Sequence, residues 1–268
     1  MSDLVITSPS NPRLKTVVAL RNRRSREVFD LTLLEGREEL ELALRAGVTP
    51  RTLLHCPELM SPGGDGQIVV AAVRHLGAET LQLSRAAFEK VAYREGPDGF
   101  LAVVPRPGVE LAALDVPPGS LLLIAQGIEK PGNLGAMLRT ADAAGVAAVI
   151  AADPVTDWGN PNVIRSSKGT VFSVPVASAT TEAVVDWMQR RDVRIVATTP
   201  DTEVLHSAAD LTGSIAVAVG AEKWGLDAAL FAAAATKVRI PMAGRADSLN
   251  AATAAAIVLF EAVRQRTS

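Results

Sequence analysis

The sequence is poor in the residue types on which several classes of protein depend. Cys56 is the only cysteine among 268 residues, so no disulfide can form within the chain and no thiolate cluster can hold zinc. The three histidines, His55, His75 and His206, are scattered and lack the i, i+4 spacing of a helical metal pair. We therefore expect no metal site.

Long apolar runs and targeting signals are also missing. The longest apolar run of the final helical stretch, residues 254–260, is far shorter than the roughly 20 residues that a membrane span needs. Residues 1–4 show neither the basic nor the apolar region of a secretory signal. These absences predict a cytoplasmic protein that does not act at a membrane.

The glycine-rich motifs of the common nucleotide-binding folds are absent too. The chain contains neither G-x-G-x-x-G nor G-x-x-x-x-G-K-[ST], which disfavours a dinucleotide-binding fold and a P-loop NTPase. The segment KPGN at residues 130–133 still allows a phosphate to bind at a strand-to-helix turn. A nucleotide-dependent synthetase or dehydrogenase is thus a disfavoured class of enzyme.

Charge is nearly balanced over the whole chain, with a formal net charge of −2 at pH 7. The N-terminal stretch is an exception, because up to residue 26 only Asp3 is acidic, whereas the basic residues there are Arg13, Lys15, Arg21, Arg23, Arg24 and Arg26. Such a run usually forms a solvated face. A basic end on an acidic protein also indicates a phosphate-binding patch.

The length and the 48% of hydrophobic residues allow one or two cores, and we expect two α/β domains. In residues 1–106 strands alternate with helices; strands are expected at 31–34, 52–55, 80–83 and 100–104, and helices at 11–27, 37–45, 67–76 and after Ser84. Prolines and glycines in residues 107–119 predict a linker.

The second domain, residues 120–268, begins with the apolar run LLLIA at 121–125, which is typical of a buried parallel strand. Further strands are expected at 147–151, 172–176, 193–197, 215–219 and 237–240, and helices at 134–144, 181–189 and 226–235, before an alanine-rich final helix. This alternation predicts a mostly parallel sheet with right-handed crossovers.

Two loops of the second domain combine glycine with polar side chains. Residues 220–225, GAEKWG, follow an apolar strand, and Gly220 and Gly225 allow the backbone to turn and to approach a ligand closely. Residues 245–250, RADSLN, precede the final helix, where Ser248 can cap the helix and still present its hydroxyl. Both loops can meet at the carboxyl end of one parallel sheet, where open α/β folds bind ligands. The alternative is an ordinary turn and a simple cap.

Asn133 and Arg139 are a third element of the candidate site. Asn133 stands near the start of the helix that follows the first strand of the domain, and Arg139 follows six residues later. The two side chains then lie within roughly 120 degrees of each other around the helix, and both can reach a site above the sheet. For this pair alone, an N-cap and a surface arginine are the alternative.

These three elements, in this order, resemble the motifs of the SpoU/TrmH-type RNA ribose methyltransferases of the SPOUT superfamily. The similarity extends over the second domain and rests on Asn133 with Arg139, GAEKWG at 220–225, IPM at 240–242 and SLN at 248–250. Three segments of the first domain, residues 8–14, 33–36 and 102–104, resemble an L30e-like substrate-binding domain. The resemblance implies a trefoil-knotted α/β methyltransferase domain that acts as a homodimer.

The activity implied by the resemblance is methyl transfer from S-adenosylmethionine to a ribose 2′-hydroxyl of RNA. The residues expected to line the cofactor pocket are Gly220, Ile240 and Leu249. The expected catalytic group comprises Asn133, Arg139, Glu222, Ser248 and Asn250. RNA contacts are expected from the basic residues Arg21, Arg23, Arg24, Arg26, Lys130, Arg165 and Lys168. Arg165 and Lys168 resemble a basic segment of the family that can reach the active site of the partner subunit. Ala221 and Trp224 depart from the small polar or glycine residues of the family pattern.

The chemistry of methyl transfer suits these residue types. A sulfonium methyl is already reactive, so the enzyme must align the hydroxyl and help to remove its proton. The family assigns the role of base to Arg139, yet a guanidinium with a pKa above about 12 is a poor proton acceptor. We prefer a role for Arg139 as a positioned cation that pairs with an RNA phosphate and the developing oxyanion, while Glu222 orients Arg139 or Asn133.

Ribosomal RNA, with the large-subunit RNA favoured, is the expected substrate because of the additional N-terminal domain, and transfer RNA is the alternative. Aromatic residues make up only 4% of the chain, so we expect recognition through shape and phosphate contacts more than through stacking. A non-catalytic RNA-binding or ribosome-assembly protein is the rival from another class. That rival predicts damaged motifs, whereas the motifs of this chain look intact.

Overall fold

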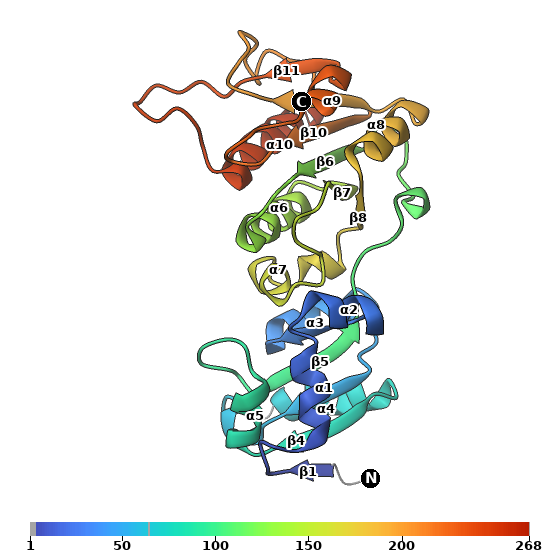
Figure 1. The fold of residues 1–268 in the computed structure, drawn as a ribbon, viewed down its shortest axis with the longest axis vertical. Coiled ribbons are helices and arrows are strands. Elements are labelled where there is room, and N and C mark those ends of the chain that lie inside the picture. The colour runs from blue at the N-terminus through green and yellow to red at the C-terminus, as the bar shows by residue number, and fades with distance from the viewer. Residues whose placement is uncertain (1–3, 64, 268) are drawn as a thin grey trace. The chain divides into compact units, whose positions relative to one another are not determined.

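The chain forms two compact α/β units in the computed structural model, which describes residues 4–63 and 65–267 (Figure 1). One unit consists of Met1–Pro107 together with Asp157–Ser173, and the other of Gly108–Thr156 together with Val174–Ser268. Residues expected to form a linker therefore belong to the second unit. Within that unit Leu111 and Leu114 are buried in the main apolar cluster.

The first unit contains a five-stranded sheet of order β1-β4-β3-β5-β2. Its strands are β1 (Leu4–Ile6), β2 (Leu31–Glu35), β3 (Thr52–His55), β4 (Glu79–Leu83) and β5 (Phe100–Pro105). Its helices are α1 (Pro12–Ala19), α2 (Arg23–Phe29), α3 (Arg37–Arg45), α4 (Asp65–His75), α5 (Arg85–Val91) and α7 (Pro161–Ser166), with 3-10 turns at Pro57–Leu59 and Thr170–Phe172. Strands β1, β4 and β3 run parallel, whereas β5 is antiparallel to both of its neighbours.

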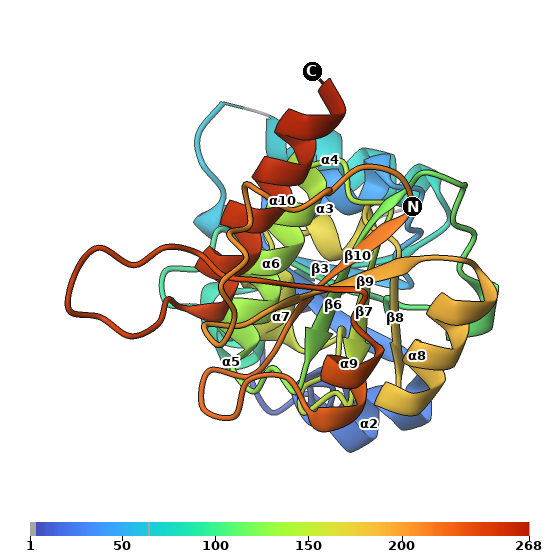
Figure 2. The ribbon, with the colours of Figure 1, turned by 90° about the horizontal axis from the view of Figure 1, so that it is seen from above.

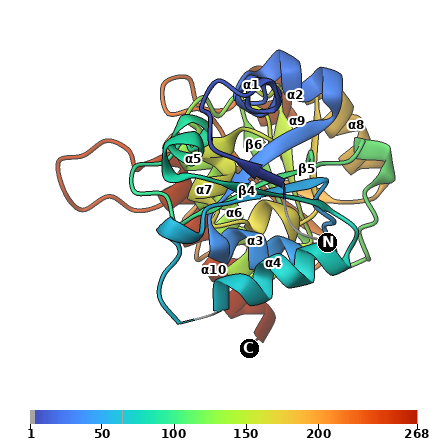
Figure 3. The ribbon, with the colours of Figure 1, turned by 90° about the horizontal axis from the view of Figure 1, so that it is seen from below.

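Helices cover both faces of this sheet. Figure 3 shows α3 and α4 on one side and α1 and α5 on the other. Because consecutive strand residues point to opposite faces, Leu33 and Leu101 pack with Leu14 of α1 and Phe88 of α5, while their chain neighbours face away from that cluster. The alternating pattern of the sequence thus becomes a three-layer arrangement.

The second unit contains a six-stranded, parallel sheet of order β11-β9-β10-β6-β7-β8. Its strands are β6 (Leu121–Gln126), β7 (Ala148–Ala152), β8 (Val176–Ala179), β9 (Arg194–Thr198), β10 (Ile215–Val219) and β11 (Thr236–Val238). Its helices are α6 (Pro131–Ala143), α8 (Thr181–Arg190), α9 (Ala228–Ala233) and α10 (Ala251–Thr267), with a 3-10 turn at Leu111–Ala113. In Figure 2, α6 and α10 lie on one face of the sheet and α8 and α9 on the other.

The predicted mixed α/β class with a mostly parallel sheet is confirmed, but several predicted elements are wrong in detail. The single helix expected at 11–27 is two helices, because the side chain of Asn22 accepts a hydrogen bond from Arg24 N (2.9 Å) and starts α2. The strand expected at 172–176 begins only at Val176, since Thr170–Phe172 is a 3-10 turn. The elements β1 and α7 were not predicted from the sequence.

Helix length and hydropathy also bear on membrane association. Within residues 4–63 and 65–267, no helix is both long and apolar enough to cross a membrane.

Candidate active site

A hydrogen-bonded cluster around Glu222 joins three distant parts of the second unit. The Glu222 carboxylate accepts from Asn133 Nδ2 (2.9 Å) and Asn250 Nδ2 (2.8 Å), and it also accepts from Lys130 Nζ. Asn250 Nδ2 lies 3.0 Å from Asn133 Oδ1 as well, so the two amides contact each other. The start of α6, the loop after β10 and the start of α10 therefore meet at one carboxylate.

The turn that carries Glu222 is closed by two glycines. Gly225 has a φ of +68°, and its N–H donates to the carbonyl oxygen of Ala221 at 2.8 Å. A Cβ atom at Gly220 would overlap the backbone of Gly225 and Leu226, so only glycine fits where this loop returns on itself. The closed turn fixes the backbone of Glu222.

The start of α10 positions Asn250. Its Oδ1 accepts from Ala252 N (2.9 Å), and its backbone carbonyl accepts from Ala254 N (2.9 Å), as expected of an N-cap residue. The prediction that Ser248 caps this helix is therefore wrong. The cap bond holds the Asn250 side chain so that its amide points toward Glu222 and Asn133.

Electrostatics keep the cluster ionised. The hydrogen bond from Lys130, followed by that from Asn133, lowers the pKa of Glu222 below its ordinary value. The same contact raises the pKa of Lys130. The Glu222 side chain is one-third exposed (33%), so solvent screens this pair, and its role is better described as orientation than as stabilisation of the fold.

A cavity of about 650 Å³ lies beside the cluster, within the volume range of small-molecule sites. Its walls include Gly220, Ala221 and Glu222 from the loop after β10, and Ile240, Ser248 and Leu249 from the segment between β11 and α10. This segment extends away from the sheet in Figures 1 and 2. The wall also contains Thr198, the last residue of β9, and Thr199 and Asp201 after it; β9 is the neighbour of β10 in the sheet.

The chemistry of the cavity fits S-adenosylmethionine, which combines a flat purine with a ribose and an amino-acid end. Val238, Ile240 and Leu249 provide apolar surface, and Thr199 and Asp201 provide a hydroxyl and a carboxylate. The residues at the end of β9 were not predicted from the sequence as part of a site. The signal that could have found them is the end of a parallel strand adjacent to β10, since such strands end at the same sheet edge.

The remaining predicted catalytic residue, Arg139, is an exposed side chain on α6. It makes no hydrogen bond or ion pair with any residue of the described chain, in contrast to Lys130, which was predicted to bind RNA but donates to Glu222. Trp224, which departs from the family pattern, is 74% exposed at the rim of the cavity, with Lys223 Nζ 4.4 Å from the centre of its ring.

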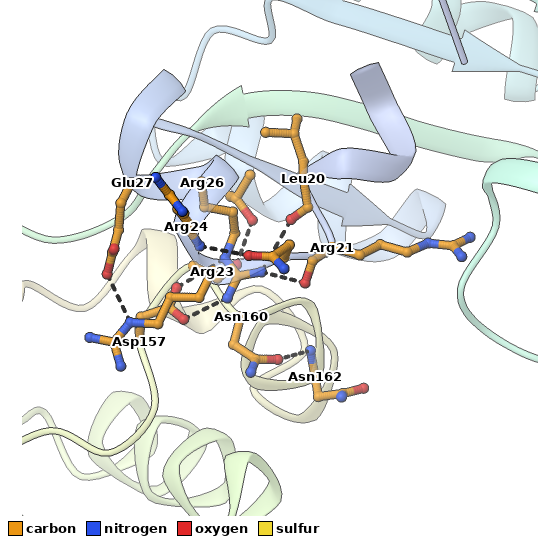
Figure 4. Close-up of polar contacts among 12 residues, drawn as sticks. Leu20, Arg21, Arg23, Arg24, Arg26, Glu27, Asp157, Asn160 and Asn162 are labelled. Atoms are coloured by element: carbon orange, nitrogen blue, oxygen red, sulfur yellow. Dashed lines mark hydrogen bonds and ion pairs between the residues drawn. The ribbon is translucent and has the colours of Figure 1, made fainter. Parts of the chain in front are cut away.

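In the first unit, Arg26 does not belong to the predicted RNA-binding surface. Its side chain is 2% exposed, and its Nε and Nη2 donate to Asp157 at 3.1 and 2.6 Å (Figure 4). Its Nη1 donates to the carbonyl oxygens of Leu20 (3.1 Å) and Arg21 (2.7 Å). Burial of a guanidinium requires such partners, so this arginine stabilises the unit and is unavailable to a ligand.

The other basic residues of this unit remain on its surface. Arg21 Nη2 donates to three consecutive carbonyl oxygens starting at Lys90, and Arg23 Nε donates to Glu27 at 2.8 Å. Arg24 and Arg165 are exposed. Lys168 is also exposed, with its Nζ 3.5 Å from Glu38.

Comparison with known proteins agrees with this geometry. A model of the "SpoU rRNA Methylase family" matches residues 120–260, and one of the "MRM3-like substrate binding domain" matches residues 11–102. A Bacillus subtilis protein, the 23S rRNA (guanosine(2553)-2'-O)-methyltransferase RlmP, is 31% identical over 95% of this chain and 97% of its own.

Solved structures give the same result. The crystal structure of an RNA 2'-O ribose methyltransferase is 42% identical, with a TM-score of 0.87 over 99% of this chain and 100% of that one. The AdoMet-bound rRNA methyltransferase from Sinorhizobium meliloti is 31% identical, with a TM-score of 0.89 over 98% of each chain. The resemblance found in the motifs is confirmed, and the chain belongs to the SpoU rRNA methylase family.

Proposed function

We propose that this protein transfers a methyl group from S-adenosylmethionine to a ribose 2′-hydroxyl of ribosomal RNA, with the large-subunit RNA as substrate. The observation that carries the proposal is the convergence of Asn133, Glu222 and Asn250 beside a cavity lined by Gly220, Ile240 and Leu249. Relatives over nearly the whole chain, whose names describe 23S rRNA 2'-O-methyltransferases, support the choice of substrate.

The cavity beside Glu222 is assigned to the cofactor. Ile240 and Leu249 would contact its purine, and the backbone near Gly220 would approach it closely because no Cβ intervenes. When bound, S-adenosylmethionine supplies an electrophilic methyl group on a sulfonium. The protein must then bring a ribose hydroxyl into line and stabilise the negative charge that develops on it.

The polar cluster and Arg139 divide this work. Asn133 and Asn250 are held in place by Glu222, so their amides are oriented before RNA binds. Arg139 has no partner within the described chain and is free to pair with an RNA phosphate and the nascent alkoxide as a positioned cation. Ser248, at the cavity wall, would hold the ribose. The proton leaves to a phosphate, a water molecule or a transiently neutral Arg139.

RNA contacts are proposed for exposed basic residues, with Arg24, Arg165 and Lys168 of the first unit as the main candidates. We further propose a homodimer in the cytoplasm, as the family resemblance implies. Neutralising these three residues together is expected to weaken RNA binding and to flatten its salt dependence, because each phosphate contact releases counterions.

Transfer of labelled methyl groups tests the proposal. Purified protein is incubated with tritiated S-adenosylmethionine and ribosomal RNA from cells that lack the modification, with total transfer RNA in a parallel reaction. We expect label in the large-subunit RNA, in dinucleotides that resist alkaline hydrolysis because the 2′-oxygen is blocked. Label in transfer RNA alone would show that transfer RNA, and not ribosomal RNA, is the substrate. Absence of label from both RNAs would favour a non-catalytic RNA-binding protein.

A further inference from the structure

The first unit contains a second cavity, of about 710 Å³, that the proposed chemistry does not use. Its walls come from α3, from the segment between β3 and α4, from the loop before β5 and from α7 and the residues just after it, all within this unit. Charged groups of both signs face it, and the apolar side chains of Met60 and Phe100 form part of its wall. Its volume is within the range of small-molecule sites.

Two of these charged groups, Glu39 and Arg94, have hydrogen-bonding capacity that no described residue uses. The Glu39 side chain is only 7% exposed, and its carboxylate accepts no hydrogen bond from any residue of the described chain. Arg94 Nη1 is likewise buried with no hydrogen-bond partner among the described residues, and it lies 3.9 Å from Glu39 Oε2. Both residues line the cavity and the Glu39 oxygens remain open to it, so the unused hydrogen-bonding capacity of this pair points to a ligand.

The backbone makes room for this pair. Gly36, at the end of β2, has a φ of +117°, and a Cβ added there would overlap both the Glu39 carboxylate and the Arg94 guanidinium. The neighbouring charges, in contrast, are bonded: Arg37 Nε donates to Glu41 at 2.7 Å, and the Arg37 backbone N–H donates to Asp98 at 2.7 Å. Glu39 and Arg94 Nη1 thus differ from these neighbours, because neither makes a hydrogen bond with a described residue.

The two groups select the chemistry of the ligand. A negative group beside this pair would be repelled by Glu39 and a positive one by Arg94, so the part of the ligand that contacts both is expected to be neutral and to present donors beside an acceptor. The edge of a nucleobase does this. Guanine places two neighbouring donors, N1–H and N2–H₂, next to the acceptor O6, and so matches both oxygens of a carboxylate and the N–H of an arginine.

We propose that this cavity binds a guanine base of the substrate RNA, with Glu39 accepting from N1–H and N2–H₂ and Arg94 donating to O6. Met60 and Phe100 contact the face of the base. Arg165 and Lys168, also at the cavity, contact the flanking phosphates. Single-stranded RNA is read in this way, through bases turned out of the stack. The assignment of the base to an RNA rests on the proposed function; the base pocket itself does not.

Binding of single nucleotides to the full chain tests the pocket. The protein is titrated by calorimetry with GMP, IMP and AMP in the presence of saturating S-adenosylhomocysteine, which fills the cavity of the second unit. IMP lacks only the 2-amino group. We expect GMP to bind about tenfold more tightly than IMP, as for one good base contact, and AMP to bind more weakly still.

Three variants complete the test. Glu39→Gln is expected to abolish the preference for GMP over IMP, whereas Arg94→Lys, which loses the guanidinium fork, weakens both nucleotides and keeps their ratio. Glu89→Gln, which removes an exposed acid of the same unit, leaves all affinities unchanged. Equal binding of GMP and IMP to the unaltered protein overturns the assignment, as does a preference that survives Glu39→Gln. If one variant fails to fold, which circular dichroism reports, the other decides. Neither result bears on methyl transfer, which label incorporation measures separately.

Discussion

Glu222 in the second unit and Glu39 in the first differ in how their charges are compensated. Glu222 is one-third exposed and accepts from three donors that come from two other segments of the unit. Glu39 is almost fully buried, accepts no hydrogen bond from the described chain and has only the Arg94 guanidinium at 3.9 Å. Burial alone would predict the opposite arrangement, since buried carboxylates need partners more.

The difference separates two kinds of site. The Glu222 cluster is complete in the isolated chain and fixes the directions of two amides, as expected where orientation matters before a substrate arrives. The Glu39 pocket is incomplete, as expected where the ligand supplies the missing partners. The same contrast applies to the arginines: each guanidinium nitrogen of Arg26 donates to a protein group, whereas Arg139 and Arg94 Nη1 have no hydrogen-bond partner among the described residues.

The largest effect is expected for Arg139→Ala, which tests whether an arginine without a partner in the described chain is required for methyl transfer. We expect the rate of methyl transfer to fall by about 10³-fold or more, because a donor to the developing oxyanion is lost. The affinity for S-adenosylmethionine, measured by calorimetry, is expected to stay the same, since Arg139 does not line the cavity. Loss of cofactor binding in this variant would contradict the division between cluster and cation.

Replacing Arg26 by alanine tests the opposite case, the fully partnered arginine. The substitution leaves Asp157 without its bidentate partner, so the free energy of unfolding is expected to fall by about 3 kcal/mol. Arg24→Ala, two residues away on the same helix but exposed, is the matched control and should leave stability unchanged while reducing the salt dependence of RNA binding. The free energy of unfolding of both variants is measured by urea denaturation. Equal stabilities would show that the buried pair contributes nothing.

Glu35, the last residue of β2, is a buried carboxylate whose protonation differs between the folded and the unfolded chain. Its Oε2 accepts from the backbone N–H groups of Tyr93 (2.8 Å) and Arg94 (3.2 Å), but Oε1 is buried and has no hydrogen-bond partner among the described residues. Burial raises its pKa from 4.5 to about 7, so the folded protein retains a proton that the unfolded chain releases above pH 4.5. The resulting stability is complete below pH 4.5 and is lost as the pH rises to about 7. We expect the loss to reach about 3 kcal/mol at most.

Unfolding midpoints measured from pH 5 to pH 8 test whether stability falls as the pH rises. Glu35→Gln cannot titrate, so its stability should be flatter over the same range than that of the unaltered protein. A parallel pH dependence in both proteins would mean that Glu35 is already ionised in the folded state at pH 5.

The sequence predicted the fold where local signals were strong. The apolar strand at Ile215–Val219 and the helix Arg37–Arg45 were predicted with their observed bounds, because periodicity and a following glycine mark them. Residues 11–27 were predicted wrongly, because helical spacing continues through Asn22 and only the cap bond to Arg24 N interrupts it. Such a bond depends on a side-chain rotamer, which composition does not reveal.

The candidate sites were predictable to different degrees for the same reason. Asn133, Glu222 and Asn250 stand in short motifs whose order along the chain resembles that of a known family, so their convergence was expected. Glu39 and Arg94 are 55 positions apart, and nothing in their sequence context distinguishes them from the exposed acids and arginines nearby. What distinguishes them is a place in the wall of one cavity with hydrogen-bonding capacity that no described residue uses, a property that exists only after folding.

The smallest effect is expected for Glu222→Gln, which tests whether the charge of this carboxylate orients Asn133 and Asn250. A glutamine keeps the size of the side chain but loses the charge, so the hydrogen bonds from Lys130 and the two amides weaken, and we expect kcat to fall about tenfold. Cofactor affinity should change little. Because Lys130 lowers the pKa of Glu222 below its ordinary value, the carboxylate is ionised at neutral pH, and the unaltered enzyme should show no loss of rate from this group between pH 6 and 8.

Glu129→Gln, which removes an exposed acid adjacent to Lys130, is the control for net charge and should leave kcat unchanged. If Glu222→Gln retained full activity, the cluster would be a structural brace of the loop after β10, and orientation of Asn133 and Asn250 would not limit the rate. A fall in kcat without a change in the unfolding midpoint separates the two roles, because a brace would lower the midpoint first.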